Sequence, residues 1–307
     1  MSHLPGVTGE ARVNKPTKPV DACLLIYDEA MIDQVVEYTI IKITNTVKNY
    51  RHNAIKCQFA SHADKTEMKA LFGLLILSGV FKSNHQDVEL LFATYGTGRD
   101  IFRATMSLRR FLILLAALRF DDERRDIDHL APISELFSEL LVNCKLNYCC
   151  GEYLAVDEIL VSFRGRCAFK RYMANKPAKY GLKIFCLCDA RMHYLYNACI
   201  DCGPIQVPNP RHLLVPTLTV LALIEPVANA NRNITVDNYF SSVELVNELR
   251  NKYLSYVGTL RANKREIPKE YFPNRQREIC SSEFGFTGTT TLVSYVPKKS
   301  KAVIIIS

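Results

Sequence analysis

The sequence predicts an α/β (α+β) protein with a helical first half and a mixed β-sheet in its second half. Before residue 150, apolar residues recur every three or four positions, which is the spacing of an amphipathic helix. After Gly151, short runs rich in β-branched and aromatic residues alternate with turns, which is typical of strands. A chain of 307 residues is long enough for two domains. The change of pattern near residue 150 is therefore the predicted boundary between them.

The first half is predicted to contain four helices. They are expected at residues 24–48, 67–80, 109–120 and from 132 onward. Ser107 is the expected N-cap of the third helix, and Pro132 opens the fourth because proline is tolerated in the first turn. Residues 1–22 contain prolines and lack periodicity, so we expect a disordered basic arm there.

The second half is predicted to be a sheet of short strands. They are expected at residues 153–156, 159–163, 183–188, 195–200, 233–236, 255–260, 290–296 and 302–306. Between the fifth and sixth, Ser241 and Glu244 have capping-box spacing and open a helix, which predicts a parallel βαβ unit after an antiparallel meander. The chain stops within an apolar strand, which we interpret as a C-terminal truncation.

Two aspartates follow apolar runs in this half. Asp157 is expected where the strand 153–156 ends, and Asp237 where the strand 233–236 ends. If these strands are neighbours, the two carboxylates face each other and repel unless a cation lies between them. Ligands that are all oxygen favour Mg²⁺ or Mn²⁺ over zinc. The alternative is that each aspartate only caps the next element.

The positive charge of the chain lies in the half that holds both aspartates. The net charge is +8, and residues 1–150 carry equal numbers of basic and acidic side chains, so the excess falls on residues 151–307. Basic residues there alternate with aromatic ones, a pattern typical of a nucleic-acid groove. The candidates are Arg164, Arg166, Lys170, Arg171, Lys176, Lys179 and Lys183. Alternatives are a solvated hairpin, or a basic face that gives solubility or binds an acidic protein.

The cysteines are predicted to be reduced thiols. No apolar run is long enough to cross a bilayer and no signal peptide is recognisable, so we expect a cytosolic or nuclear protein. Eleven cysteines in such a compartment do not predict disulfides. Cys186 and Cys188 alternate on a predicted strand, so we expect core residues there and no zinc site.

Several of these segments resemble the piggyBac transposase family. The matching residues are 156–166 (VDEILVSFRGR), 176–183 (KPAKYGLK), 233–242 (NITVDNYFSS), 258–264 (GTLRANK) and 293–299 (VSYVPKK). The resemblance implies a helical dimerisation and DNA-binding region at 23–150 and an RNase H-like catalytic core, partial here, at 151–262. Residues 263–307 would be the start of a β-rich insertion domain, truncated in this chain.

The resemblance also implies a function. Asp157 and Asp237 match the family's first two catalytic aspartates, which with a third acid hold two Mg²⁺ (or Mn²⁺) ions for cleavage and strand transfer at transposon ends. No residue of this chain matches the third aspartate or the family's zinc module, so we expect an incomplete two-ion site and a catalytically incomplete protein. The expected partners are double-stranded DNA and a second copy in a homodimer, in the nucleus, with no membrane and no small-molecule substrate. The alternative is a domesticated DNA-binding protein without enzymatic activity.

Overall fold

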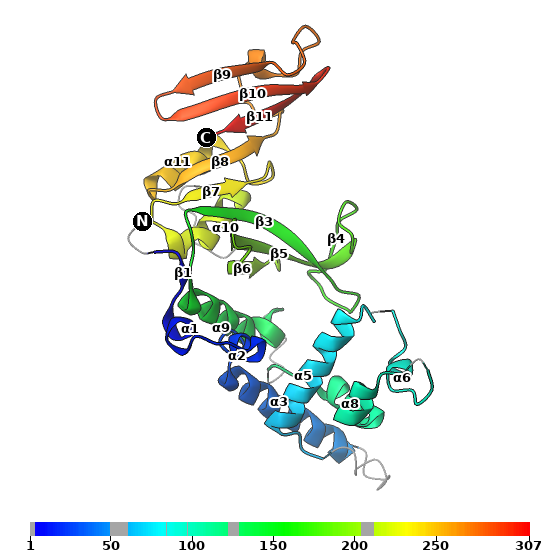
Figure 1. Ribbon diagram of the computed structural model, residues 1–307. Coiled ribbons are helices and arrows are strands. Elements are labelled where there is room, and N and C mark those ends of the chain that lie inside the picture. The colour runs from blue at the N-terminus through cyan, green and yellow to red at the C-terminus, as the bar shows by residue number, and fades with distance from the viewer. Residues whose placement is uncertain (1–3, 50–60, 84, 97, 122–128, 204–211) are drawn as a thin grey trace. The chain divides into compact units, whose positions relative to one another are not determined.

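The chain folds as two compact units (Figure 1). The computed structural model describes residues 4–49, 61–83, 85–96, 98–121, 129–203 and 212–307. Residues 16–140 form one unit, here the helical unit. Residues 1–15 and 141–307 form the other, here the sheet unit. The division falls within helix α9 (Ala131–Asn147), shortly before the change of sequence pattern near residue 150.

The helical unit contains the predicted helices. Its elements are α2 (Pro19–Leu24), α3 (Glu29–Asn49), α5 (Lys65–Val80), α6 (Val88–Leu91), α7 (Asp100–Thr105), α8 (Leu108–Ala117) and the start of α9. The Ser107 side chain accepts a hydrogen bond from the N–H of Arg110, so the predicted N-cap of α8 is confirmed. Apolar faces of α3, α5 and α8 form the core around Val35, Leu71 and Leu114. None of the helices in the described ranges is both long and apolar enough to cross a bilayer.

The sheet unit is built on one large mixed sheet. Its described strands are β3 (Tyr153–Ser162), β4 (Arg171–Tyr172), β5 (Tyr180–Asp189), β6 (Leu195–Ile200), β7 (Asn233–Val236), β8 (Ser255–Leu260), β9 (Ser282–Thr287), β10 (Thr290–Lys298) and β11 (Lys301–Ile306). The order is β4-β5-β3-β7-β8-β11-β10-β9, with β6 beside β5. The pairs β3–β7 and β7–β8 are parallel, and the other pairs are antiparallel. The strand β9 had no counterpart among the predicted strands.

One predicted strand end is wrong. Strand β3 continues through Asp157, and β5 pairs with it from Leu154 to Ser162. Only the parallel partner β7 stops, with Val156 opposite Val236. Asp157 therefore lies inside a strand, because an antiparallel neighbour supports both of the apolar runs that the sequence suggested as separate strands.

The predicted parallel βαβ unit is confirmed as β7, α11 (Val243–Asn251) and β8. The N-cap of α11 is Ser242, whose side chain accepts from the N–H of Leu245, and not Ser241.

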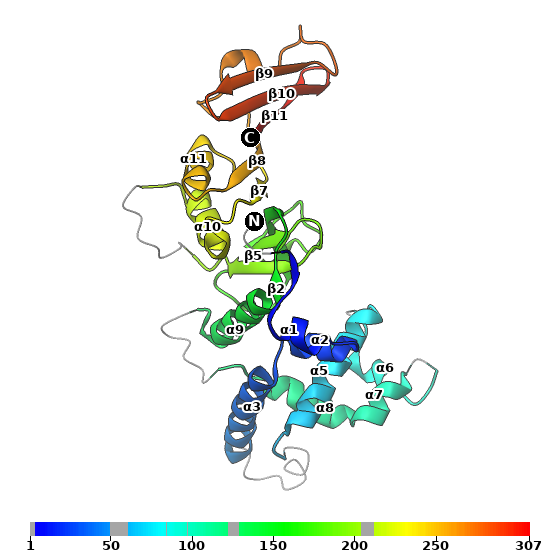
Figure 2. The same cartoon turned by 60° about the vertical axis from the view of Figure 1, so that its left-hand side comes forward.

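Figure 2 shows α11 lying beside α10 (Val215–Ile224). Both helices pack on one face of the sheet, which we call the covered face, over Leu154, Val156, Ile234, Val236 and Tyr256. A 3₁₀ turn, η1 (Glu225–Val227), follows α10, and a second, η2 (Lys269–Tyr271), follows β8.

Ordered elements occupy much of the segment for which the sequence suggests a loose arm. Strand β1 (Gly6–Val7) pairs with β2 (Tyr148–Cys149), and α1 (Gly9–Asn14) follows it. The side chain of Asn147 accepts from the N–H of Ala11 at 3.0 Å. The arm lacks periodicity because its elements are short and are held by residues 146–149, which no local pattern reveals.

Candidate functional site

Asp157 lies on β3, and Asp237 directly follows the neighbouring strand β7. Val156 and Val236 are the last paired residues of the parallel strands β3 and β7, so the two aspartates occupy the next position on each. Adjacent strands lie ~4.8 Å apart. Both valines are buried on the covered face, whereas both aspartates are exposed, so the carboxylates continue the alternation and turn to the other face.

Each carboxylate is held at one oxygen. Oδ1 of Asp157 accepts from the N–H of Glu158 at 2.7 Å, and Oδ1 of Asp237 accepts from the N–H of Tyr239 at 2.8 Å. Within the described part of the chain, the second oxygen of each carboxylate has no hydrogen-bond partner and neither acid has a Lys or Arg partner. Two unpaired carboxylates in neighbouring positions repel each other, and a shared cation would relieve that repulsion.

Other acids of the sheet have charged or hydrogen-bonding partners within the protein. Glu158 lies 3.2 Å from the Lys176 amine, and Glu283 lies 3.5 Å from the guanidinium of Arg277. The buried Asp189 accepts from four donors, which include the N–H of Gly151 and the Tyr148 hydroxyl. Asp157 and Asp237 therefore differ from their neighbours in what surrounds them.

The backbone of Asp237 is fixed by buried hydroxyl groups. The Ser241 hydroxyl donates to the carbonyl oxygen of Asp237 at 2.8 Å, and the Tyr256 hydroxyl donates to Ser241 Oγ at 2.6 Å. Burial and the nearby charge of Asp237 raise the pKa of Tyr256 to about 12, so the phenol stays protonated and keeps donating. This chain of hydrogen bonds positions Asp237 from the covered face.

The donor set is suited to a hard divalent cation, although the described residues supply only two acids. Carboxylate oxygens are the preferred ligands of Mg²⁺ and Mn²⁺. No cluster of three or more His, Cys, Asp or Glu is found in the ranges that the structure describes. Cys186 lies opposite Asp157 on β5, but burial and the neighbouring Cys188 raise the pKa of its thiol to about 12. Cys186 is therefore a buried core thiol, as expected from the sequence.

The seven predicted basic residues fall into two groups. Arg164, Arg166 and Lys179 are exposed, and their side chains have no partner among the described residues. The other four are engaged inside the protein: Lys170 donates to Gly165 O, Arg171 pairs with Asp201, Lys176 with Glu158, and the Lys183 amine lies 4.5 Å from the ring centroids of Phe185 and Tyr239. Tyr172 and Tyr180 alternate with these basic residues in the sequence. Their side chains are 59% and 51% exposed, and their ring centroids lie 4.8 Å apart.

Two residues near Asp237, Arg261 and Asn238, were not predicted as site residues from the sequence. Arg261, which follows β8, donates from Nε to Asn238 Oδ1 at 3.1 Å, and its guanidinium carbon lies 6.0 Å from the Tyr239 ring centroid. The segment 258–264 had signalled a resemblance but no role for these residues. Arg261 reaches Asn238 only because β8 lies next to β7, and the sequence spacing does not reveal that neighbourhood.

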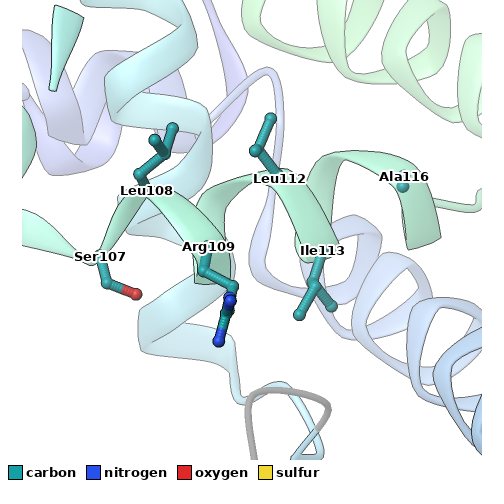
Figure 3. Close-up of a pocket in the computed structure, with 6 residues that line it drawn as sticks. All are labelled: Ser107, Leu108, Arg109, Leu112, Ile113 and Ala116. Atoms are coloured by element: carbon teal, nitrogen blue, oxygen red, sulfur yellow. The ribbon is translucent and has the colours of Figure 1, made fainter. Parts of the chain in front are cut away.

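A hollow of about 600 Å³ on α8 is a separate feature of the helical unit (Figure 3). Its described lining is mostly apolar and contains no acid, so it supplies no candidate metal ligand. The lining residues are Ser107, Leu108, Arg109, Leu112, Ile113 and Ala116.

The family model described as "Transposase IS4" matches residues 18–307. A solved piggyBac transposase, described as a synaptic complex with hairpin DNA, superposes on 99% of this chain and 63% of its own, with a TM-score of 0.89 and 33% identity. The chain belongs to the piggyBac transposase family.

Curated human proteins of the piggyBac family are also similar. PiggyBac transposable element-derived protein 3 is 22% identical over 262 residues, which cover 79% of this chain and 40% of that protein. PiggyBac transposable element-derived protein 2 is 24% identical over 226 residues, covering 72% and 38%. The chain spans about two fifths of the length of these relatives. The structural match confirms the predicted fold class, a helical region and an RNase H-like mixed sheet core.

Proposed function

We propose that this chain is a piggyBac-like, transposase-derived protein whose ancestral activity is metal-dependent DNA cleavage and strand transfer at transposon ends. Asp157 and Asp237 would be two of the three acids of that DDE/D site. The observation that supports this most directly is the register of β3 and β7, which brings these two unpaired acids together. DNA in the structure of the related transposase complex supports a DNA partner for this chain.

Asp157 and Asp237 would hold a Mg²⁺ or Mn²⁺ ion through their outward oxygens. Such an ion, when bound, activates water or a 3′-hydroxyl and stabilises the leaving oxygen in phosphodiester cleavage. The Tyr256–Ser241 hydrogen bonds keep Asp237 in place, and Lys176 holds Glu158 away from the pair. Because Glu158 alternates to the opposite face of β3 from Asp157, it is not placed to join the pair as a third acid.

Binding of Mn²⁺ tests the proposed metal site without requiring activity. Titration followed by electron paramagnetic resonance should show a site that Asp157→Asn or Asp237→Asn each weaken by about tenfold or more. Glu278→Gln, which changes an exposed acid outside the site, should leave the titration unchanged. Equal Mn²⁺ binding by the parent chain and both aspartate variants would refute the assignment.

Cleavage assays test whether the chain is catalytically incomplete. With Mg²⁺ and a donor DNA carrying transposon ends, we expect no excision, because only two acids come together in the described residues and a site with two of three metal ligands would be slower by orders of magnitude. Robust excision would show that the site is complete after all.

The second candidate function is a nuclear DNA-binding protein without enzymatic activity. It is favoured by the finding that no third acid joins Asp157 and Asp237 in the described residues. It predicts duplex binding that Asp157→Ala and Asp237→Ala leave unchanged, with no metal-dependent nicking. Metal-dependent nicking that is abolished by these substitutions would instead support the enzymatic function.

Both candidates require the exposed basic residues to bind duplex DNA. Replacing Arg164, Arg166 and Lys179 together by alanine should weaken binding and reduce the slope of log affinity against log salt by about 0.9 per lost phosphate contact. Replacing Arg12, Lys15 and Lys18 removes the same charge elsewhere and serves as the control. Equal losses in the two triple variants would mean that binding responds to net charge and not to this site.

A further inference from the structure

One face of the C-terminal strands β9, β10 and β11 is open along its whole width. Figures 1 and 2 show these strands side by side in orange and red. The register places Phe284 opposite Val293, which in turn lies opposite Ile305. None of the eight described side chains on this face is buried; they are Ser282, Phe284, Phe286, Thr291, Val293, Tyr295, Val303 and Ile305. The opposite face is closed, with Ser294, Val296, Ile304 and Ile306 buried.

Three aromatic rings stand on the open face. Phe284 and Phe286, two positions apart on β9, are 58% and 73% exposed, and Tyr295 on β10 is 37% exposed. Successive residues of a strand point to opposite faces, so all three rings project from the same side. We call Phe284, Phe286 and Tyr295 the aromatic face. Leaving two phenylalanines this exposed is costly in water unless they contact a partner.

The exposed charges at the turn between β10 and β11 are positive. Lys298, Lys299 and Lys301 are exposed at the turn between β10 and β11. The only acid within the three strands, all of them described, is Glu283, which alternates to the closed face and pairs with Arg277. A partner that combines flat apolar surfaces with negative charge fits this arrangement, whereas an apolar protein segment would not use the lysines.

We propose that the aromatic face binds an unpaired nucleic-acid strand. Bases stack on Phe284, Phe286 and Tyr295, and the lysines at the β10–β11 turn contact the phosphates. Duplex DNA keeps its bases stacked on each other, so it offers no free ring face here. The site goes beyond the proposed metal chemistry and does not depend on Asp157 or Asp237.

A tryptophan reporter tests stacking directly, because the chain has no Trp. In Phe286→Trp, the single indole should be quenched when an oligothymidine strand is added to the full chain, since a stacked base quenches its emission. Tyr253→Trp is the matched control, because Tyr253 is also highly exposed, at 70%, but lies outside the aromatic face. Equal quenching at both positions, or none at position 286, would overturn the proposal.

Leucine substitutions separate base stacking from apolar docking. In Phe284→Leu combined with Phe286→Leu, most of the apolar area remains but the rings are lost. We expect oligothymidine affinity, measured by fluorescence anisotropy, to fall by about tenfold or more. Unchanged affinity would contradict stacking and indicate a face that docks an apolar partner. Thermal unfolding by circular dichroism should match the parent chain, because both side chains are exposed.

Two further variants distinguish this site from the proposed catalytic one. Replacing Lys298, Lys299 and Lys301 by glutamine should reduce the salt dependence of oligothymidine binding. Asp157→Asn with Asp237→Asn should leave oligothymidine binding unchanged, and the leucine variants should leave the Mn²⁺ titration unchanged. Loss of strand binding in the aspartate variant would mean that the strand lies at the acids and not on the aromatic face.

Discussion

Gly258 is a residue at which the fold leaves no space for a side chain. A Cβ atom there would lie 2.3 Å from the Tyr256 hydroxyl oxygen and 2.6 Å from Ser241 Oγ. These are the two hydroxyl groups that position Asp237. The glycine is thus required by the hydrogen-bond chain behind the candidate site, and not by an unusual backbone angle.

Replacing Gly258 by alanine should therefore destabilise the sheet unit. We expect a loss of about 1–3 kcal/mol in the free energy of unfolding, because the added methyl group overpacks a rigid core. Urea denaturation followed by circular dichroism measures the change. In the Tyr256→Phe background, which removes the nearest oxygen, the same substitution should cost less. Gly79→Ala is the control, since its Cβ meets nothing within 4 Å; a similar loss there would contradict the steric explanation.

At the scale of elements, Asp189 connects the end of β5 to the start of β3. It is only 2% exposed and accepts hydrogen bonds from the N–H groups of Gly151, Arg191 and Met192 and from the Tyr148 hydroxyl. Burial by itself would raise the pKa of this carboxyl. The four hydrogen bonds outweigh burial and lower the pKa below its usual value.

Asp189→Asn should destabilise the sheet unit most at neutral pH. Because the folded-state pKa of Asp189 lies below the unfolded value, its stabilisation is fully present above the ordinary aspartate pKa and is lost as pH falls toward the lowered value. We expect a loss of about 2–3 kcal/mol at pH 7 that shrinks in acid. Urea denaturation at a series of pH values measures this.

Asp201→Asn is the matched control for Asp189→Asn. Asp201 forms a partly exposed pair with Arg171 at 3.2 Å, which should contribute less than about 1 kcal/mol. A difference between the parent chain and Asp189→Asn that stays constant from neutral to acidic pH would contradict the proposed source of stability.

The elements also explain which predictions local patterns could supply. Periodicity predicted α3, α5 and α8, and the β-branched run before Asp237 predicted β7, because each pattern depends on one buried face. At Asp157, the sequence pattern suggested that the strand ends. In the structure β3 continues, and only its pairing with the parallel strand β7 stops there. Local patterns could not choose between Ser241 and Ser242 as the cap of α11, because only the tertiary structure shows that Ser241 bonds Tyr256.

At the scale of the whole molecule, the two aspartates could be paired from the sequence but their surroundings could not. The similar apolar runs that precede Asp157 and Asp237 were enough to suggest that the two acids meet. The hydroxyl chain from Tyr256, the ion pair between Lys176 and Glu158 and the contact of Arg261 with Asn238 all depend on strand order. The order and register of the strands thus decide which side chains support the site. A short stretch of sequence does not contain this long-range information.

The discontinuous sheet unit leads to a prediction about the N-terminus. Residues 1–15 belong to the sheet unit although the helical unit separates them from the rest of it in sequence. Thr8 donates from its N–H to Asn147 O at 3.0 Å and from its hydroxyl to Leu146 O at 2.9 Å. A loose arm would be dispensable, whereas an arm bonded in this way should stabilise the end of α9 and β2.

Deleting residues 1–15 should therefore weaken the sheet unit by about 2 kcal/mol, from two or three lost hydrogen bonds. In amide hydrogen exchange, β2 and the last turn of α9 should lose protection, because the deletion removes the segment that pairs with β2 and donates hydrogen bonds to Leu146 and Asn147, so both elements should fray more often. Amides of α5 are the internal control, since α5 lies in the helical unit and packs on its own core. Unchanged protection at residues 146–149, or an equal loss in α5, would mean that these residues do not act as part of the sheet unit in solution.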